Sequence, residues 1–119
     1  MSSFLKVANQ LSGTAFTLFC AGQASVDAEG TLVHSGDMAA QLAQAVDNLE
    51  AVLGETGMSL SNIVRLTTFT TDVELLLQHF GVLGPRTGAL GVAPPSALVG
   101  VARQAYPELM VEIEATAVQ

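Results

Sequence analysis

Residues 109–118 alternate strictly between two kinds of side chain. One set is apolar and consists of Leu109, Val111, Ile113, Ala115 and Ala117, and the other consists of Met110, Glu112, Glu114, Thr116 and Val118. Successive side chains of a β-strand point to opposite faces of the sheet, so this period of two predicts a strand over Leu109–Val118. The strand buries its apolar face and leaves two glutamates on the other, which requires a sheet with one covered face.

The middle of the chain changes to a helical period. Apolar residues recur at spacings of three and four: Met38, Leu42, Ala45, Val46, Leu49, Val52 and Leu53. Such a stripe predicts an amphipathic helix. Asp37 is suited to accept a hydrogen bond from the first turn, and Gly57 is suited to the left-handed position after the last turn.

The remaining segments supply further strands and one more helix. Residues rich in β-formers predict a hairpin formed by Thr14–Gln23 and Gln23–Val33, a strand over Asn62–Thr71 and another over Ser96–Ala102. Asp72 is a candidate cap for a second helix whose apolar stripe is Val73, Leu76, Leu77 and Phe80. We expect Gly84-Pro85 to end that helix and residues 84–95 to form a loop.

The order of these elements defines the fold class. A hairpin, a helix, a strand, a helix and two strands predict a single α+β domain over residues 1–119, with two helices covering one face of a mixed sheet. The other face then lacks a second layer within a chain of 119 residues. We expect another copy of the chain to cover it, because large apolar surfaces are rarely left in water.

Charge and composition limit the partners. The chain has 11 acidic and 4 basic residues and a formal net charge of -7, so it has few cations to neutralise phosphates and nucleic acid is not an expected partner. No apolar run approaches the ~20 residues of a membrane helix, and the first residues lack a signal-peptide pattern, so we expect a cytoplasmic protein without a membrane partner. One cysteine and two separated histidines predict no metal and no other cofactor.

Several segments carry a resemblance to a known family. They are FCAGQ (Phe19–Gln23), the turn Asp27–Gly30, the helix QLAQAVDNLEAVLGETG (Gln41–Gly57), RLTTFTTD (Arg65–Asp72) and VEIEATAV (Val111–Val118). In this order they resemble the RidA (YjgF, reactive intermediate deaminase) family, also described as endoribonuclease L-PSP. The resemblance implies a chorismate-mutase-like homotrimer, with sheets packed into a barrel and small-molecule clefts between subunits. It also implies hydrolysis of imines or enamines such as 2-aminoacrylate without a cofactor.

One departure from the family concerns the arginine that clamps the substrate carboxylate. Ser96 occupies that position, and one hydroxyl cannot replace the two charge-assisted hydrogen bonds of a guanidinium. Arg103 is a candidate replacement if a bulge turns it to the same face, although a solvent-facing residue or a pair with Glu108 is the simpler expectation. Arg86 is a second candidate, with a solvated loop arginine as its simpler interpretation. The family tyrosine near the N-terminus is also absent.

The other candidate site residues follow the resemblance. Glu112 matches a family glutamate that positions the attacking water, and we expect partial burial to raise its pKa. Backbone groups near Gly22 and Gly100 are expected to hold polar substrate atoms, whereas Cys20 is expected in the core. Two functions remain open: an imine or enamine deaminase with poor activity on 2-aminoacrylate, and a non-catalytic module that binds a small molecule or a protein. The charge of -7 gives little support to an RNA-cleaving activity.

Overall fold

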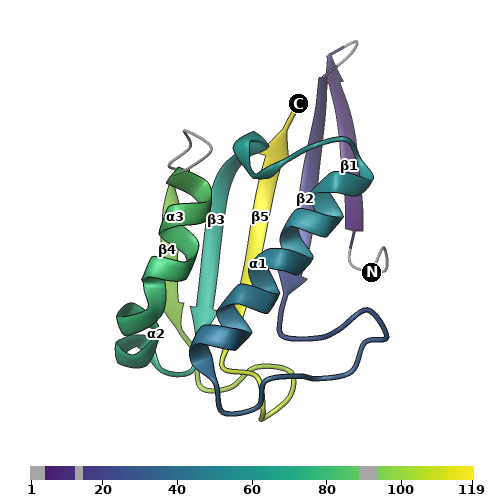
Figure 1. The fold of residues 1–119 in the computed structure, drawn as a ribbon. Helices are drawn as coiled ribbons and strands as arrows, with labels where there is room; N and C mark the ends of the chain where they lie inside the picture. Colours follow the sequence, from purple (N-terminus) through teal and green to yellow (C-terminus); the bar gives the residue numbers. More distant parts are fainter. Residues whose placement is uncertain (1–4, 13–14, 89–93) are drawn as a thin grey trace.

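The computed structural model describes residues 5–12, 15–88 and 94–119, with side chains for residues 16–86 and 94–119. Its strands are β1 (Leu5–Ser12), β2 (Ala15–Gln23), β3 (Ile63–Thr70), β4 (Ser96–Gly100) and β5 (Val111–Val118). Its helices are α1 (Met38–Glu55), α2 (Val73–His79) and α3 (Leu83–Gly88), with 3-10 turns at Leu60–Asn62 and Phe80–Val82 (Figure 1). None of these helices is both long enough and apolar enough to cross a membrane.

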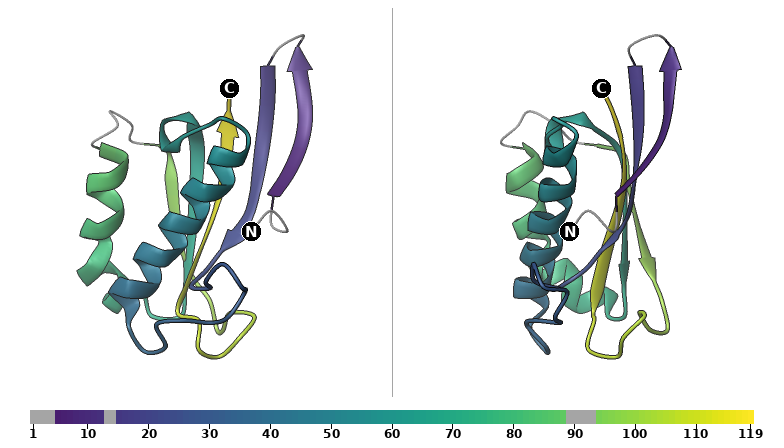
Figure 2. Two further views of the ribbon diagram at one scale, coloured as in Figure 1. Left: turned by 45° about the vertical axis from the view of Figure 1, so that its right-hand side comes forward. Right: turned by 90° about the vertical axis from the view of Figure 1, so that its right-hand side faces the viewer.

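The strands form one mixed sheet in the order β1-β2-β5-β3-β4. The parallel pair is β3 with β4, and the other neighbours are antiparallel. The helices lie together on one side of this sheet (Figure 2). The α+β class and the mixed sheet predicted from the sequence are therefore confirmed.

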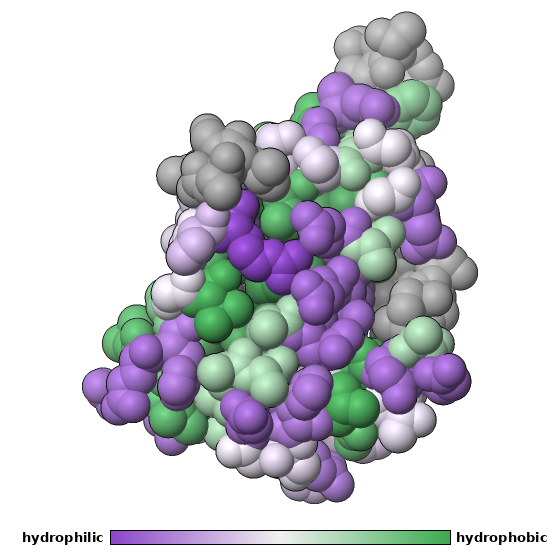
Figure 3. Space-filling model, viewed as in Figure 1, coloured by the Kyte–Doolittle hydropathy of each residue, from purple (hydrophilic) through white to green (hydrophobic). Residues whose placement is uncertain are grey.

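The predicted alternation of β5 and the predicted stripe of α1 meet in the core. The apolar set of β5 and the stripe of α1 are buried together, with Leu18, Leu60, Leu66 and Leu76. Asp37 accepts a hydrogen bond from the Ala40 amide at 3.0 Å, and Gly57 has a φ of +77°, as the capping prediction required. The outer surface over α1 is mostly hydrophilic (Figure 3), which is typical of an amphipathic helix with one covered face.

The predicted hairpin was wrong in its second strand. β2 pairs instead with an earlier strand, β1, which was not predicted. Residues 24–37 form a loop with one isolated bridge between Val26 and Leu32. Side chains of α1 hold this loop instead of a strand ladder. Asn48 donates to the carbonyls of Ala24 and Val26 at 2.8 and 2.9 Å.

The predicted end of the second helix was also wrong. α2 ends at His79, but a 3-10 turn and α3 follow directly, so the helical path continues through Gly84-Pro85. Pro85 lies in the first turn of α3, where a missing N–H breaks no hydrogen bond of that helix. Leu77, assigned to the buried stripe, is 50% exposed. The described chain therefore has three helices on the covered face where two were predicted.

The opposite face of the sheet, which we call the open face, has no helix over it (Figure 2). In its centre, β3 presents Arg65 and Thr67, and β5 presents Glu112, Glu114 and Thr116. Large apolar side chains lie beside these polar ones: Phe19 on β2 is opposite Thr116 and 47% exposed, Phe69 on β3 is opposite Glu112, and Val99 on β4 is 38% exposed. The open face therefore mixes polar and apolar side chains, whereas the sequence predicted an apolar face.

Candidate functional site

Two of the residues predicted to form the site, Gly22 and Glu112, line one hollow of about 190 Å³, which we call the Glu112 hollow. Its other walls include Gln23, Val26, Tyr106 and Leu109. β2 and β5 form this place through an irregularity of register: Cys20 pairs with Ala115, but Gln23 pairs with Ile113. The extra residue in β2 shifts its end relative to β5 and puts Gly22 against the side chain of Glu112.

The contact between Gly22 and Glu112 is close enough to require glycine. A Cβ atom added to Gly22 would overlap the carboxylate of Glu112 and lie 2.8 Å from its Cγ. The φ of Gly22 is not in the left-handed region, so the requirement comes from space and not from backbone conformation. Gly22 therefore fixes where the carboxylate can lie.

The surroundings of Glu112 favour its protonated form. Burial raises the pKa of the Glu112 carboxyl, and the negative charge of Glu114 two residues along the same strand face raises it further. Among the described side chains, no cation lies within ion-pair distance of Glu112. The direction agrees with the sequence prediction: the Glu112 carboxyl holds its proton more tightly than an exposed glutamate does.

Gln23 contributes a buried amide to the wall of this hollow. The residue is 1% exposed, and its Nε2 donates to the Ala21 carbonyl at 3.0 Å. Its Oε1 is buried without a hydrogen-bond partner among the described residues. The adjoining loop of residues 101–110 is held by a second buried amide, because Gln104 donates to the Phe69 carbonyl at 3.0 Å.

Ser96 and Gly100 lie away from the Glu112 hollow in a single chain. The register pairs Ser96 with Leu66 at the start of β4, whereas Glu112 is opposite Phe69, three residues further along β3. The hydroxyl of Ser96 donates to the Pro94 carbonyl at 3.0 Å. A Cβ at Gly100 would meet Val73 of α2 at 3.2 Å, so that side of Gly100 faces the helices.

The two arginines proposed as replacements for the family arginine are both engaged elsewhere. Arg103 lies beyond the end of β4, and its guanidinium donates to the carbonyls of Gln104 and Ala105 at 3.0 and 3.3 Å. Arg86 is not in a loop but on α3, where it contacts Asp47 at 2.6 Å and Glu50 at 2.8 Å on α1. Neither guanidinium reaches Glu112 or Ser96.

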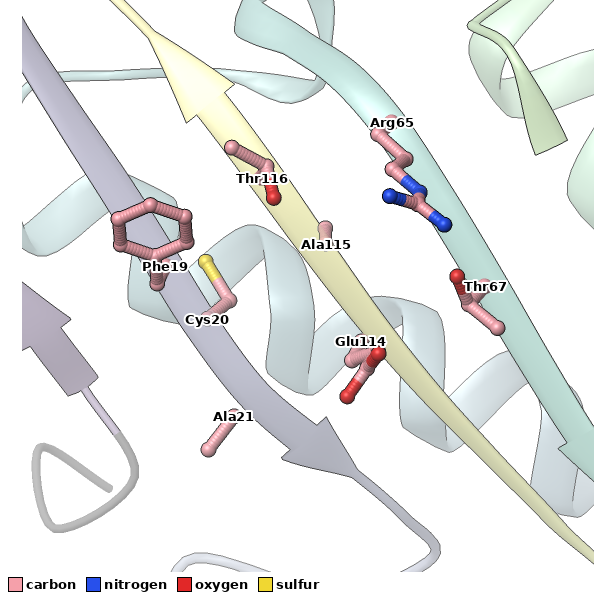
Figure 4. A pocket seen from close by; sticks show the side chains of 8 residues that line it. All are labelled: Phe19, Cys20, Ala21, Arg65, Thr67, Glu114, Ala115 and Thr116. Atoms are coloured by element: carbon pink, nitrogen blue, oxygen red, sulfur yellow. The ribbon is translucent and has the colours of Figure 1, made fainter. Parts of the chain in front are cut away.

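Sequence reasoning gave no role to Arg65, which lies on the open face. It lines a hollow of about 330 Å³, the Arg65 hollow, together with Phe19, Ala21, Thr67, Glu114 and Thr116 (Figure 4). A second hollow of about 240 Å³ places Arg65 beside Ser96. The position of Arg65 could have been predicted from the period of two in β3 and β5, which puts Arg65 and Thr67 on the same face of the sheet as Glu114.

The cysteine and the histidines form no reactive cluster in the described part of the chain. Cys20 is buried against the helices, and burial raises the pKa of its thiol to about 11, so it has little thiolate at neutral pH. This agrees with the expectation of a core cysteine. Across residues 5–12, 15–88 and 94–119, no three His, Cys, Asp or Glu residues are grouped as metal ligands would be.

Comparisons with known proteins agree on one family. The family model described as endoribonuclease L-PSP matches residues 7–119. The chain is 30% identical over 100 residues to a RutC family protein of Pyrococcus abyssi, covering 76% of this chain and 79% of that protein. It is 35% identical over 101 residues to protein DfrA of Myxococcus xanthus, covering 84% and 74%.

Solved structures show the same fold. The crystal structure of YyfB from Yersinia pestis, described as a Rid family protein of unknown function, has a TM-score of 0.79 and 36% identity, covering 95% of this chain and 84% of that one. A structure from Mycobacterium tuberculosis described as a member of the YjgF family has a TM-score of 0.72 and 29% identity, covering 85% and 77%. With the family model matching nearly the whole length, the chain belongs to the endoribonuclease L-PSP family, which is also called the RidA or YjgF family.

Proposed function

We propose that this protein binds a small uncharged or cationic imine in the Glu112 hollow and hydrolyses it to a carbonyl compound and ammonia. One observation carries the proposal: a partly buried carboxylate with a raised pKa is held against the backbone at Gly22, in a hollow large enough for a few non-hydrogen atoms. Membership of the RidA family supports this class of reaction.

The reaction needs one group that both accepts and donates a proton. The imine reacts as its nitrogen-protonated, iminium form. The ionised Glu112 carboxylate accepts a proton from water as the water oxygen bonds to the iminium carbon, which gives a neutral carbinolamine. The protonated carboxyl then returns that proton to the nitrogen, the carbon–nitrogen bond breaks, and the departing ammonia takes the hydroxyl proton, which leaves the carbonyl compound and an ammonium ion. A pKa raised by burial suits this double role near neutral pH, because the two protonation states are then closer in free energy.

The same surroundings disfavour substrates that carry a carboxylate. Ser96 replaces the family arginine, while Arg86 and Arg103 are held by other partners. A carboxylate entering the Glu112 hollow would meet a like charge in a partly desolvated place. We therefore propose that 2-aminoacrylate and the imines of α-amino acids are poor substrates.

We further propose that the protein works as a homotrimer with its ligand clefts between subunits. Ser96 and Glu112 lie at different levels of the sheet in one chain, so a single ligand meets both only if a second copy contributes one of them. Exposed Phe19, Val64 and Val99 supply apolar area for contact between copies. Sedimentation is expected to give about three times the mass of one chain, and a monomer at micromolar concentration would contradict this part of the proposal.

An imine assay with matched variants tests the catalytic proposal. Oxidases generate imines from amines and amino acids, and semicarbazide competes for each imine, so enzymatic hydrolysis appears as slower semicarbazone formation. Glu112→Gln is expected to lower kcat/KM by about 10²-fold or more, whereas Glu108→Gln, an exposed glutamate in the adjoining loop, is expected to retain activity. If the wild-type protein hydrolyses none of the imines but binds uncharged analogues, it is a non-catalytic binding module.

A further inference from the structure

The Glu112 hollow has one charged end and a largely apolar wall. Glu112 is the single charged side chain among the described residues that line it. The apolar side chains come from two loops, with Ala24 and Val26 in one and Tyr106 and Leu109 in the other. A site of this composition fits a ligand that has one polar end and one apolar end.

The two loops lie at one end of the sheet and not on its open face. The loop of residues 24–37 begins where β2 ends, and the loop of residues 101–110 leads into β5. Because β2 and β5 are antiparallel neighbours, the end of one strand lies beside the start of the other (Figure 1). The apolar wall is therefore separate from the face that another copy of the chain is proposed to cover.

One helix holds both loops in place. Gln41 of α1 donates to the Glu108 carbonyl at 2.9 Å and accepts from the Met110 amide at 2.8 Å. Asn48, seven residues further along the same helix, binds the carbonyls of the other loop, as described above. Since α1 fixes both walls, the width of the hollow is set before a ligand enters, and less binding energy is lost in ordering the site.

Tyr106 is the large side chain of this wall that remains exposed to water. It is 56% exposed, the highest value among the large apolar side chains of residues 16–86 and 94–119. Its backbone is fixed, because its carbonyl accepts a hydrogen bond from the Leu109 amide at 3.0 Å. An aromatic ring held in this way loses contact with water when an apolar group of a ligand packs against it, which favours binding.

We propose that Tyr106 determines the specificity of the Glu112 hollow by favouring cationic ligands that carry an apolar alkyl chain. This inference rests on the proposed function, and the substrates that it selects are the imines of alkylamines. The iminium nitrogen lies at the Glu112 carboxylate, and the alkyl chain packs against the ring of Tyr106. Each CH₂ group that is removed from water should improve binding about fourfold.

Alkylammonium ions test this preference without catalysis, because they resemble iminium ions but are not hydrolysed. The chain has one tyrosine and no tryptophan, so its tyrosine fluorescence reports on Tyr106 alone. Pentylammonium is expected to change this fluorescence and to bind at least about tenfold more tightly than ethylammonium, which is three CH₂ groups shorter. It is also expected to bind at least about threefold more tightly than 3-methoxypropylammonium, whose ether oxygen loses its hydrogen bonds to water against an apolar wall.

Three variants, measured by isothermal titration calorimetry, assign the preference to Tyr106. Tyr106→Ala is expected to lower the ratio of pentylammonium to ethylammonium affinity to about threefold or less, because the ring no longer covers the alkyl chain. Tyr106→Phe keeps the ring and is expected to keep the wild-type ratio. The matched control is Leu77→Ala on α2, which removes an apolar side chain of 50% exposure on the helical side and should leave the ratio unchanged.

The outcomes separate this inference from the proposed hydrolysis. Equal binding of pentylammonium and ethylammonium by the wild-type protein would overturn the specificity, even if imines are hydrolysed. A wild-type ratio in Tyr106→Ala would overturn it as well, and so would a changed sedimenting mass with both ions weakened equally, because Tyr106 then joins copies of the chain. The expected ratios in a protein that hydrolyses no imine would support the specificity of the hollow and refute the hydrolysis.

Discussion

Replacing Gly22 with alanine tests the position of the Glu112 carboxylate, because the substitution displaces the carboxylate without changing the glutamate itself. The added Cβ would overlap the carboxylate, and ordinary contact begins at 3.4 Å, so the oxygen must move by roughly 2 Å. A catalytic group misplaced by about 1 Å can cost ~10²-fold in rate. We therefore expect Gly22→Ala to lower kcat/KM for imine hydrolysis at least ~100-fold, which corresponds to about 2.7 kcal/mol.

The folded state should tolerate the same change. The backbone at Gly22 is one that alanine adopts, and the overlapping atoms belong to the end of a flexible side chain. Alanine lowers the conformational entropy of the unfolded chain, which stabilises the folded state by about 0.4–1 kcal/mol. This gain offsets the cost of about 0.5–1.5 kcal/mol for moving the Glu112 side chain to a less favourable rotamer. The free energy of unfolding should thus change by less than about 1 kcal/mol, so the loss of activity is the dominant effect.

Steady-state kinetics and thermal unfolding of the same samples measure both quantities. The matched control is Gly54→Ala on the exposed side of α1, where an added Cβ meets nothing within 4 Å. That variant should gain up to about 1 kcal/mol of stability and keep wild-type kinetics. Wild-type turnover by Gly22→Ala would refute the placement of Glu112 at the reacting atoms.

Three further changes have defined outcomes. Glu114→Gln removes the like charge and should lower the pKa of Glu112 without restoring its usual value, because burial remains; carboxyl ¹³C NMR measures the shift. Glu112→Gln should stabilise the protein more at pH 7 than at pH 4. The pKa of Glu112 in the folded state lies above the usual 4.5, so the wild-type protein loses stability as the pH rises from 4.5 through the folded-state pKa, and the glutamine variant does not. Thermal unfolding at both pH values tests the sign. Asn48→Ala leaves two loop carbonyls without their donor and should cost about 1–3 kcal/mol in urea unfolding, and a change below 0.5 kcal/mol would contradict the tethering role.

Periodic patterns were sufficient for most of the fold. The alternation of residues 109–118 and the stripe from Met38 to Leu53 each predicted a buried face, because one-sided burial leaves a regular spacing in the sequence. The loop before α1 left no such spacing. Its conformation depends on Asn48 and Gln41, whose amides bind backbone groups far along the chain, and a lone amide in a helix does not indicate its partners.

Gln41 also explains why the last strand begins later than predicted. Its Oε1 accepts from the Met110 amide at 2.8 Å, so that N–H is used outside the sheet and β5 begins at Val111. The helix through Pro85 was missed for a related reason. A proline ends a helix only when it lies beyond the first turn, and nothing local in the sequence announced that a new helix begins at Leu83.

The candidate site could be predicted only in part. Gly22 and Glu112 were each proposed from the resemblance, but their direct contact depends on the irregular register at the end of β2. Ser96 was identified as a departure from the family, whereas its distance from Glu112 follows from strand pairing that one sequence does not reveal. Arg65 has a readable position on its strand, but only the register places it diagonally from Glu114.

The central claim is that Glu112 acts on imines without a carboxylate, and one ratio tests it most directly. An amine oxidase converts isopentylamine to an uncharged imine, and an L-amino acid oxidase converts L-leucine to the corresponding imine that carries a carboxylate. For each imine, the enzymatic kcat/KM is divided by the rate constant of uncatalysed hydrolysis, and the two quotients are compared. We predict a normalised ratio of at least ~10 in favour of the uncharged imine, because a tenfold preference needs only ~1.4 kcal/mol of repulsion in the transition state. A ratio below 1, with Glu112→Gln as active as the wild-type protein on both imines, would contradict the account.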